Sequence, residues 1–584
     1  MNFETYATGA NSLPDFYNPT KMAELTQLYM DKNIILSNII DRLDGMFQKT
    51  YNVNSARNIS FANPFLSLGI KYLTSLSEDK NTISRIKQSI IYDSLASIDE
   101  KLLTKEQRLA LNQIIDHPSY INIISGVAGS GKSYLTKTII DHLNNSNQDE
   151  TLDTLILAPT HVAVTNITNA IKDSVKGRDY QEDPSTLSSL YVRHRFDTMY
   201  NSVKSYVPEH LMIIDEAFAS SAHLLIFAII YGILTKSYIL LIGDPHQLPA
   251  IAIDSTPFMI SLFKNKFALV TTPLRFNQRA SSNGDIAVTA NEVVTKKPLT
   301  KLRPVTVERL LEHTEDYEAS FIDLEKIDQK DNLALISKLY WEFENKNSDA
   351  DNIVPTVILT SVNKDRMVIN SKLHLEFIQK HLTDFKQHLI PDGIEGKDHG
   401  VIFKGEPAIA QDTVRPANKN ILKGGSLMRV QNTHHDPRFP LNDTISLIDQ
   451  NHEALTYNLS DYSSKGETDN DIIKISDSID YAYATTVHKV QGASISNVIL
   501  YLPKLMLGHF RNNALYSALT RARYHLIILS TPEILSKTIQ TSHYVNVKDA
   551  LKITKLKNSP EKIKDSLRFY MTDQNSYKVQ KNRL

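Results

Sequence analysis

The chain has 584 residues, too many for a single hydrophobic core, so we expect about three to five domains or subdomains. Its 64 Lys and Arg residues balance 65 Asp and Glu residues, so global charge neither indicates a nucleic-acid partner nor excludes a local basic track. Cysteine is absent, which excludes disulfides, thiolate zinc sites and a cysteine nucleophile. The first residues lack the features of a signal peptide, and the longest apolar runs are shorter than a membrane span. We therefore expect a cytoplasmic protein with no membrane partner.

Residues 1–96 contain two stretches with helical periodicity and no motif that indicates a function. We interpret them as an N-terminal accessory domain of unknown role. The helical segment that follows, 103–115, begins with a capping box in which Thr104 caps the helix and Gln107 lies three residues later. The Gln107 amide could also bind an adenine edge, since it carries both a donor and an acceptor.

A glycine-rich turn at 126–133, GVAGSGKS, which we call the P-loop, follows an apolar run and precedes a segment with helical periodicity. This strand–turn–helix context is the one in which such a string binds nucleotide phosphates through backbone N–H groups. Lys132 would reach the β- and γ-phosphates of ATP, and Ser133 would hold Mg²⁺. The predicted nucleotide-binding residues are Gln107, Gly126, Gly129, Ser130, Gly131, Lys132 and Ser133.

Two later apolar runs end in polar residues suited to the same chemistry. Asp215 and Glu216 follow the run 211–214; Asp215 would organise Mg²⁺ through water, and Glu216 would orient or deprotonate the attacking water. Gln247 follows the run 238–242 and is suited to sensing the γ-phosphate. Arg275 is the residue predicted to reach that phosphate with a positive charge, and Arg279 is the alternative.

Other residues suit contact with a nucleic-acid strand. Thr160, His161 and Thr186 occur in turns after apolar runs, where α/β sheets place their ligands; ordinary strand-to-helix turns would explain them equally well. Residues 191–206 interleave basic and aromatic side chains, including Arg193 and Tyr200. That combination suits single-strand binding or a strand-separating wedge, and a solvated hairpin is the alternative.

The second half of the chain repeats the α/β pattern. A buried strand is predicted at 354–360, strand-like pieces in 372–480 indicate a small β-rich insertion, and another buried strand is predicted at 498–502. Arg521 lies just after a predicted helix, 513–519. It is either a surface residue at a helix end or an arginine finger that reaches the P-loop across a cleft.

Seven segments occur in one order: GVAGSGKS, LAPTHVAV, IIDEA, LIGDPHQLPAI, LRFNQR, TTVHKVQGAS and YSALTRAR. Over residues 97–530 this set resembles the superfamily 1 helicases, most closely the RecD-like and phage Dda-like branch. The resemblance implies an α/β fold with two RecA-like domains in tandem that sandwich ATP and move 5′ to 3′ along single-stranded DNA. It assigns γ-phosphate contacts to Gln247, Arg275 and Arg521. It also places Thr160, His161, Thr486, His488 and Lys489 in strand-contacting motifs.

The resemblance also predicts the domain bounds. Domain 1A would span 97–300, with a hairpin (1B) at about 186–210, and 301–352 would be a helical linker. Domain 2A would comprise 353–371 and 481–530, with a β-rich, barrel-like subdomain 2B inserted at 372–480. The N-terminal domain and a C-terminal tail at 531–584 have no counterpart in a minimal relative.

Three functions remain open from the sequence. The first is an ATP- and Mg²⁺-dependent 5′-to-3′ DNA helicase that acts at junctions of single and double strands. The second is a single-strand translocase that displaces bound proteins, and the third is a nucleotide-dependent switch that binds DNA or a replication partner. Candidate protein partners are a single-strand binding protein and a polymerase, and we expect a monomer acting in replication or recombination, phage-encoded and located in a host bacterial cytoplasm.

Overall fold

The computed structural model describes a large part of the motor region but not the ends of the chain. The predicted N-terminal domain and the residues after 541 lie outside the described residues. The described ranges are 97–116, 121–146, 154–171, 184–193, 211–220, 224–225, 228–229, 231–232, 237–248, 268–271, 274, 284–313, 316–346, 353–381, 394–395, 401–416, 420–435, 438–439, 442–450, 452–464, 472–505 and 510–541.

The first domain contains a parallel sheet of six strands in the order β3-β2-β4-β5-β1-β6. Its strands are short and mostly buried, as expected for a parallel sheet covered on both faces. Because β1 lies beside β5, the turns that follow these two strands meet at one edge, where Ser125 pairs with Gly243. The strands are β1 (Ile121–Ser125), β2 (Thr154–Ala158), β3 (Ser185–Thr186), β4 (Leu211–Ile214), β5 (Tyr238–Gly243) and β6 (Ala268–Val270).

The helices of the first domain come after strands along the chain, except for the first two, which precede β1. The first long helix buries Ala110, Leu111 and Ile114, a spacing that places them on one face against the sheet. Residues 185–193 form the edge strand β3 and a helix, so the predicted hairpin does not begin at 186; residues 194–210 lie outside the described residues. The helices are η3 (Glu100–Leu102), α7 (Lys105–Asp116), α8 (Lys132–Ser146), α9 (His161–Ile171), α10 (Leu187–Arg193) and η4 (Ala217–Ala219).

The second domain is built on another six-stranded parallel sheet, in the order β19-β9-β20-β21-β8-β7. It extends beyond the bounds expected from the sequence, because β7 and β8 come from the predicted linker. The strands are β7 (Arg303–Pro304), β8 (Ala319–Asp323), β9 (Thr356–Thr360), β19 (Ala484–Thr486), β20 (Ile495–Leu502) and β21 (Ala522–Ser530).

Seven described helices accompany this second sheet. The helix at 285–295 packs through Ile286, Ala290 and Val293 into the same core as Leu515, so the second domain begins well before residue 353. The helices are α14 (Asp285–Thr295), α15 (Val307–Glu312), η6 (Leu324–Lys326), α16 (Asn332–Lys346), α17 (Asn363–Lys380), α20 (Asn512–Leu519) and α21 (Pro532–Gln540).

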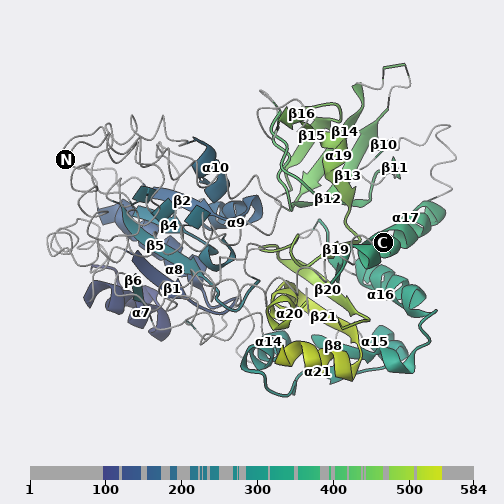
Figure 1. Cartoon of the computed structure of the whole chain (residues 1–584), viewed down its shortest axis with the longest axis horizontal. Coiled ribbons are helices and arrows are strands. Elements are labelled where there is room, and N and C mark those ends of the chain that lie inside the picture. The colour runs from purple at the N-terminus through teal and green to yellow at the C-terminus, as the bar shows by residue number, and fades with distance from the viewer. Residues whose placement is uncertain are drawn as a thin grey trace, which may run out of the picture.

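Between α17 and β19 the chain forms an antiparallel sheet of five strands, in the order β15-β14-β13-β12-β18. In Figure 1 this sheet lies above the second domain at the right, and the first domain lies at the left. Its strands are β12 (Pro407–Ala410), β13 (Leu427–His434), β14 (Thr444–Asp449), β15 (Ala454–Asn458) and β18 (Ile479–Tyr481). Shorter elements accompany it: β10 (Ile394–Glu395), β11 (Val401–Ile402), β16 (Tyr462–Ser464), β17 (Ile472–Lys474) and α19 (Ile475–Ser478).

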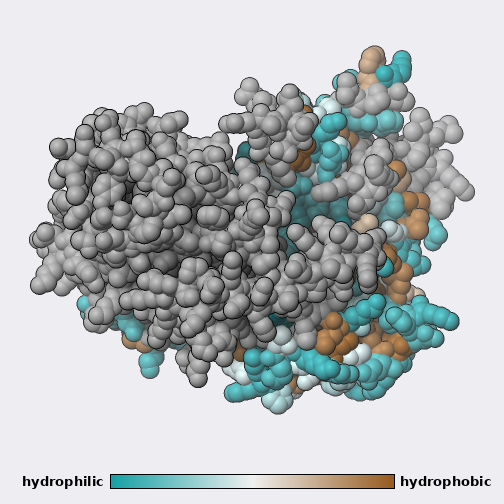
Figure 2. Space-filling view, viewed as in Figure 1, coloured by the Kyte–Doolittle hydropathy of each residue, from teal (hydrophilic) through white to brown (hydrophobic). Residues whose placement is uncertain are grey.

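The described surface visible over the second domain and the five-stranded sheet is largely hydrophilic, with smaller hydrophobic patches between (Figure 2). Within the part of the chain that the structure describes, no helix combines the length and the apolar character needed to cross a membrane.

Candidate active site

The glycine-rich turn lies between β1 and α8, as predicted. Gly129 and Gly131 have φ angles of 77° and 82°, which side-chain-bearing residues rarely adopt. A Cβ atom at Gly126 would lie 2.6 Å from Ser130 Oγ and 2.8 Å from Leu274 Cβ. The loop therefore depends on these glycines to bring its backbone N–H groups together at the N-terminus of α8, an arrangement that binds phosphates.

The polar groups of this loop fit a nucleotide. The ammonium of Lys132 donates to the carbonyl oxygens of Gly126 (2.9 Å) and Val127 (3.0 Å), so it lies directly over the loop. Among the described residues, the buried Ser130 hydroxyl and Gln247 Oε1 have no hydrogen-bond partner. Buried polar atoms without partners are costly, and a bound phosphate group with its water shell would supply partners.

The acidic pair follows β4. Asp215 is buried and donates its backbone N–H to the Leu157 carbonyl (2.8 Å). Glu216 is held in the left-handed conformation, at φ 50°. Burial and the neighbouring charge of Glu216 raise the pKa of Asp215 to about 7, and the positive charge of Lys132 opposes that rise. The Asp215 carboxyl thus lies within electrostatic reach of the P-loop lysine, where a divalent cation would favour its ionised form.

The turn after β5, residues 244–248, lies against the P-loop. Gly126 donates its N–H to the Gly243 carbonyl (3.1 Å), and Asp244 Oδ1 accepts the His246 N–H (2.9 Å). Gln247 lies within this turn and is buried. One edge of the first sheet therefore brings together Lys132, Asp215 and Gln247, which the sequence placed in a single site.

A helix of the second domain completes this site, which the sequence did not predict. Its buried residues Asn513, Tyr516 and Ser517, spaced i, i+3 and i+4, form one face that we call the α20 face. Asn513 Nδ2 donates to the carbonyls of His246 (2.9 Å) and Gln247 (3.3 Å). Ser517 Oγ accepts the N–H of Leu248 (2.8 Å), whose side chain packs into the second domain's core. The α20 face thus holds the turn after β5 through several independent contacts.

Tyr516 joins the two phosphate-side loops. Its hydroxyl donates to Asp244 Oδ2 (2.7 Å) and accepts the backbone N–H of Ala128 in the P-loop (3.0 Å). Burial and the adjacent Asp244 carboxylate raise the pKa of the Tyr516 phenol well above its ordinary value, so the phenol stays neutral. A single hydroxyl from the second domain therefore contacts both the P-loop and the turn that carries Gln247. In the sequence, the helical spacing of residues 513–517 indicated only that these side chains lie on one face of a helix.

Arg521 follows α20 and is buried within the second domain. Its guanidinium donates to the carbonyls of Ser517 (3.1 Å) and Ala493 (3.0 Å) and to the Thr520 hydroxyl (3.4 Å). The side chain therefore supports the helix that carries the α20 face, and its predicted contact with a phosphate stays a prediction. Arg275 and Arg279 lie outside the described residues.

The structure gives Gln107 partners other than an adenine. Its Oε1 accepts the Thr104 N–H (3.0 Å), and the Gln107 N–H is donated to Thr104 Oγ1 (3.3 Å), which confirms the capping box. Its Nε2 donates to the carbonyl of Gly131 in the P-loop (3.0 Å), and the side chain is fully buried. Here the amide connects α7 to the phosphate loop; adenine binding would require it to leave these partners.

The predicted strand-contacting residues of the first domain lie at the ends of β2 and β3, which are adjacent and parallel. Thr160 Oγ1 accepts the Ala163 N–H (3.2 Å), and Thr186 Oγ1 accepts the Ser189 N–H (3.1 Å). Both hydroxyls therefore cap the helix that follows. These residues thus form ordinary strand-to-helix turns, which is the alternative that the sequence left open. The Arg193 side chain and the whole of Tyr200 lie outside the described residues.

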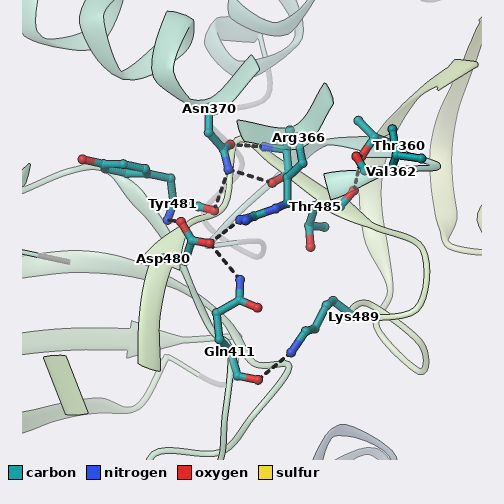
Figure 3. A network of polar contacts seen from close by, with 10 residues as sticks. Thr360, Val362, Arg366, Asn370, Gln411, Asp480, Tyr481, Thr485 and Lys489 are labelled. Atoms are coloured by element: carbon teal, nitrogen blue, oxygen red, sulfur yellow. Dashed lines mark hydrogen bonds and ion pairs between the residues drawn. The ribbon is translucent and has the colours of Figure 1, made fainter. Parts of the chain in front are cut away.

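In the second domain, the turn after β19 contains Thr486, His488 and Lys489. The Lys489 ammonium donates to the carbonyl of Gln411 (2.6 Å), and the Gln411 amide donates to Asp480 Oδ2 (3.0 Å), as Figure 3 shows. Asp480 also forms a buried ion pair with Arg366 of α17. This network joins the turn after β19 to the base of the five-stranded sheet.

The segments of the two domains that are predicted to contact a DNA strand touch each other around Val162, in the first turn of α9. Cβ atoms built on Gly425 and Gly492 would lie 3.3 Å and 3.5 Å from its two methyl groups, and both glycines have positive φ. Asn166 Nδ2 donates to the Gly492 carbonyl (2.7 Å). Thr160 and His161 are therefore held next to the turn that carries Lys489.

Comparisons with known proteins agree with this arrangement. Residues 107–252, from Gln107 through the turn with Gln247, match the family described as AAA domain. Residues 481–529, which include the Lys489 turn, α20 and Arg521, match the UvrD-like helicase C-terminal domain. Among curated proteins, the chain is similar to the RecBCD enzyme subunit RecD of Buchnera aphidicola, with 21% identity over 498 residues, 79% of this chain and 78% of that protein.

Solved structures similar to the chain include two Pif1 helicases. One is from Bacteroides in complex with ADP-AlF3 and single-stranded DNA: 17% identity, TM-score 0.43, covering 78% of this chain and 98% of that one. The other is from Candida albicans: 16% identity, TM-score 0.44, covering 77% of this chain and 98% of that one.

Two parallel α/β sheets with a P-loop on the first define a P-loop nucleoside triphosphatase with tandem motor domains. The two family matches, the RecD relative and the ordered motifs identify the chain more closely. Together they indicate an ATP-dependent DNA helicase that is similar to the superfamily 1, RecD-like helicases.

Proposed function

We propose that this helicase moves 5′ to 3′ along single-stranded DNA and separates duplex ahead of it, with each ATP hydrolysed between the two domains. The observation that carries the proposal is the α20 face. Through Asn513, Tyr516 and Ser517 it contacts both loops of the first domain that would surround a γ-phosphate. Opening and closing of the domains would therefore be linked to the state of that phosphate.

The residues of the first domain have distinct roles in the hydrolysis. Lys132 and the loop N–H groups bind the β- and γ-phosphates of ATP, and Ser133 and Asp215 hold Mg²⁺, which neutralises phosphate charge when bound. Glu216 orients the attacking water and accepts its proton. Gln247 contacts the γ-phosphate, and Arg521 is the candidate cation from the second domain, with Arg275 as a second cation from the first.

A short chain of contacts leads from the nucleotide to the strand track. Gln247 precedes Leu248, whose carbonyl accepts a hydrogen bond from Gln491 Nε2 (2.9 Å). Gln491 belongs to the turn that carries His488 and Lys489 and ends at Gly492, against α9. We propose that loss of the γ-phosphate moves this turn relative to Thr160 and His161, and that the motion advances the protein along DNA.

Strand displacement on two partial duplexes tests the proposal. One duplex carries a 5′ single-stranded tail and the other a 3′ tail, and both are given ATP and Mg²⁺. Unwinding of the 5′-tailed duplex alone supports the proposed activity and polarity. Unwinding of the 3′-tailed duplex alone would keep the motor and overturn the polarity. The Glu216→Gln variant is the control for hydrolysis.

The second candidate is a single-strand translocase that displaces bound proteins. It is supported by the strand-contacting turns, which do not themselves require a strand-separating wedge. DNA-stimulated ATPase activity without unwinding of either duplex would favour it, and displacement of streptavidin from a biotinylated single strand would test it directly. A single-strand binding protein and a polymerase remain the proposed partners of a monomeric enzyme.

A further inference from the structure

In the connection between β12 and β13 the structure describes residues 411–416 and 420–425, which form an arm at one end of these two strands. Val414 and Leu422 exchange backbone hydrogen bonds of 2.9 Å and 3.0 Å across it. Both side chains are fully buried in the hydrophobic core beneath. We call residues 411–416 and 420–425 the β12–β13 arm.

The opposite face of this arm is basic. Side chains alternate along paired strands, so Arg415 and Lys423, which follow the two buried residues, lie on the face away from the core. Both are exposed. Two cations on one exposed face form an electrostatic surface suited to a polyanion.

This basic face is directed at the first domain. Arg415 Nη2 donates to His161 Nε2 (2.8 Å) and to Ser189 Oγ (3.1 Å), which belong to α9 and α10. Burial, followed by the positive charges of Arg415 and Lys423, lowers the pKa of His161 to about 4. The guanidinium thus lies where the strand-contacting ends of β2 and β3 meet, among groups that prefer a negative ligand to another cation.

The arm is anchored to the strand-contacting turn of the second domain. Gln411, at its start, accepts from Lys489 and donates to Asp480, which the ion pair with Arg366 holds in place (Figure 3). At its end, a Cβ atom on Gly425 would lie 3.1 Å from the Lys489 carbonyl and 3.3 Å from Val162. The arm therefore joins the two domains at the proposed strand track.

We infer that Arg415 and Lys423 bind the phosphodiester backbone of the DNA single strand. His161 and Ser189 are neutral acceptors for the Arg415 guanidinium. A phosphodiester oxygen carries a negative charge, so it adds Coulombic attraction to the guanidinium and can be bound in bidentate geometry. A strand entering the track would therefore draw the guanidinium from His161 and Ser189. The inference rests on the proposed function, because it assumes that a single strand follows this track.

The test uses the full chain and a fluorescently labelled thymidine oligonucleotide, whose affinity is measured by anisotropy at several salt concentrations. Each lost phosphate contact should reduce the slope of log affinity against log salt by about 0.7. We expect Arg415→Ala to weaken binding about 5- to 10-fold, and the double variant with Lys423→Ala to lower the slope by about 1.4. Arg415→Lys should retain most of the slope because it keeps the charge.

Lys404→Ala is the matched control. Lys404 is an exposed cation of the same subdomain, but it precedes Gly405, whose neighbour is Phe377 of α17, away from the first domain. We expect this variant to bind like the parent and to keep its DNA-free ATPase rate.

Three results would count against the inference in different ways. Unchanged affinity and slope for Arg415→Ala and Lys423→Ala would overturn it. So would weaker binding with an unchanged slope, because only packing would then have been lost. If the parent chain binds no single strand, the proposed function falls and the inference falls with it.

Discussion

The two domains meet in two places that differ in chemistry. On the nucleotide side, the α20 face contacts the P-loop and the turn after β5 through buried side chains, at distances of 2.7–3.3 Å. On the strand side, Val162 packs against Gly425 and Gly492, and Arg415 and Asn166 reach across from exposed positions. The first contact consists mainly of directional hydrogen bonds, and the second mainly of close packing with polar groups at its rim.

This difference assigns different tasks to the two places. A buried hydrogen bond is costly to leave unmade, so the nucleotide-side contact has few intermediate arrangements between made and broken. Packing between a methyl group and glycine backbone has no such directionality, and exposed charges can change partners at little cost. We expect the nucleotide side to set the rate of hydrolysis and the strand side to set the response to DNA.

The largest effect should come from removing the proton acceptor. In Glu216→Gln we expect kcat for ATP to fall by about 10²-fold or more, since general base catalysis contributes at least this much. ATP binding should persist, because the P-loop and Lys132 are untouched. Steady-state hydrolysis and nucleotide titration check the two halves of this prediction. Undiminished turnover would remove Glu216 from the active site.

Breaking the nucleotide-side contact should have the next largest effect. Tyr516→Phe removes the hydroxyl that joins Ala128 to Asp244, and the loss of a buried hydrogen bond to a charged group costs about 1.5–3 kcal/mol. If this cost falls on domain closure, DNA-stimulated kcat should drop at least about 10-fold. The basal rate without DNA should change less, and the ratio of the two rates is the measurement.

Tyr340→Phe is the matched control for that variant. The Tyr340 hydroxyl is also buried in the second domain, but it has no hydrogen-bond partner among the described residues. Its removal should leave both rates and the melting temperature at or above the parent values. Equal losses in the two variants would mean that the Tyr516 contacts carry no special role.

The strand-side contact can be tested with a pair of glycines. Gly425 and Gly405 have φ angles of 84° and 92°, so alanine should strain the backbone similarly at both. At Gly425 the added methyl would also press on Val162 and Lys489. Such overpacking costs about 1 kcal/mol or more.

We expect Gly425→Ala to lower stimulation by single-stranded DNA about 5-fold, which is the equivalent of that cost. Gly405→Ala should lower only the melting temperature. Matching DNA responses in the two variants would show that Val162 and Gly425 do not communicate with the strand.

The smallest effect is a pH dependence of stability in the metal-free protein. Asp215 has its pKa raised to about 7 in the folded state, against 3.8 for the ordinary carboxyl. Between these values the folded protein keeps a proton that the unfolded chain has lost, so stability falls as pH rises across this window. Asp215→Asn should flatten that part of the melting-temperature profile. An unchanged profile would contradict the raised pKa.

The local parts of the fold and site could be predicted from the sequence. The P-loop, the acidic pair and the Thr104–Gln107 capping box depend on residues within a few positions of one another. The second domain was predicted too small, because β7 and β8 lie among helices, where only the pairing of β8 with β21 and of β7 with β8 reveals the sheet. The caps formed by Thr160 and Thr186 were among the alternatives, and local spacing alone did not decide between them.

The sequence by itself determined that this chain binds a nucleoside triphosphate, because strand, glycine turn and helix are contiguous and their chemistry is local. Only the tertiary structure decided what the second domain adds. Tyr516 and Ala128 are 388 positions apart, and Arg415 and His161 are 254 apart. No sequence pattern marks either pair as a contact, since each contact is created by the packing of one folded domain on another. The physical reason is that hydrogen bonds depend on distance in space, which the chain sets only after both sheets have formed.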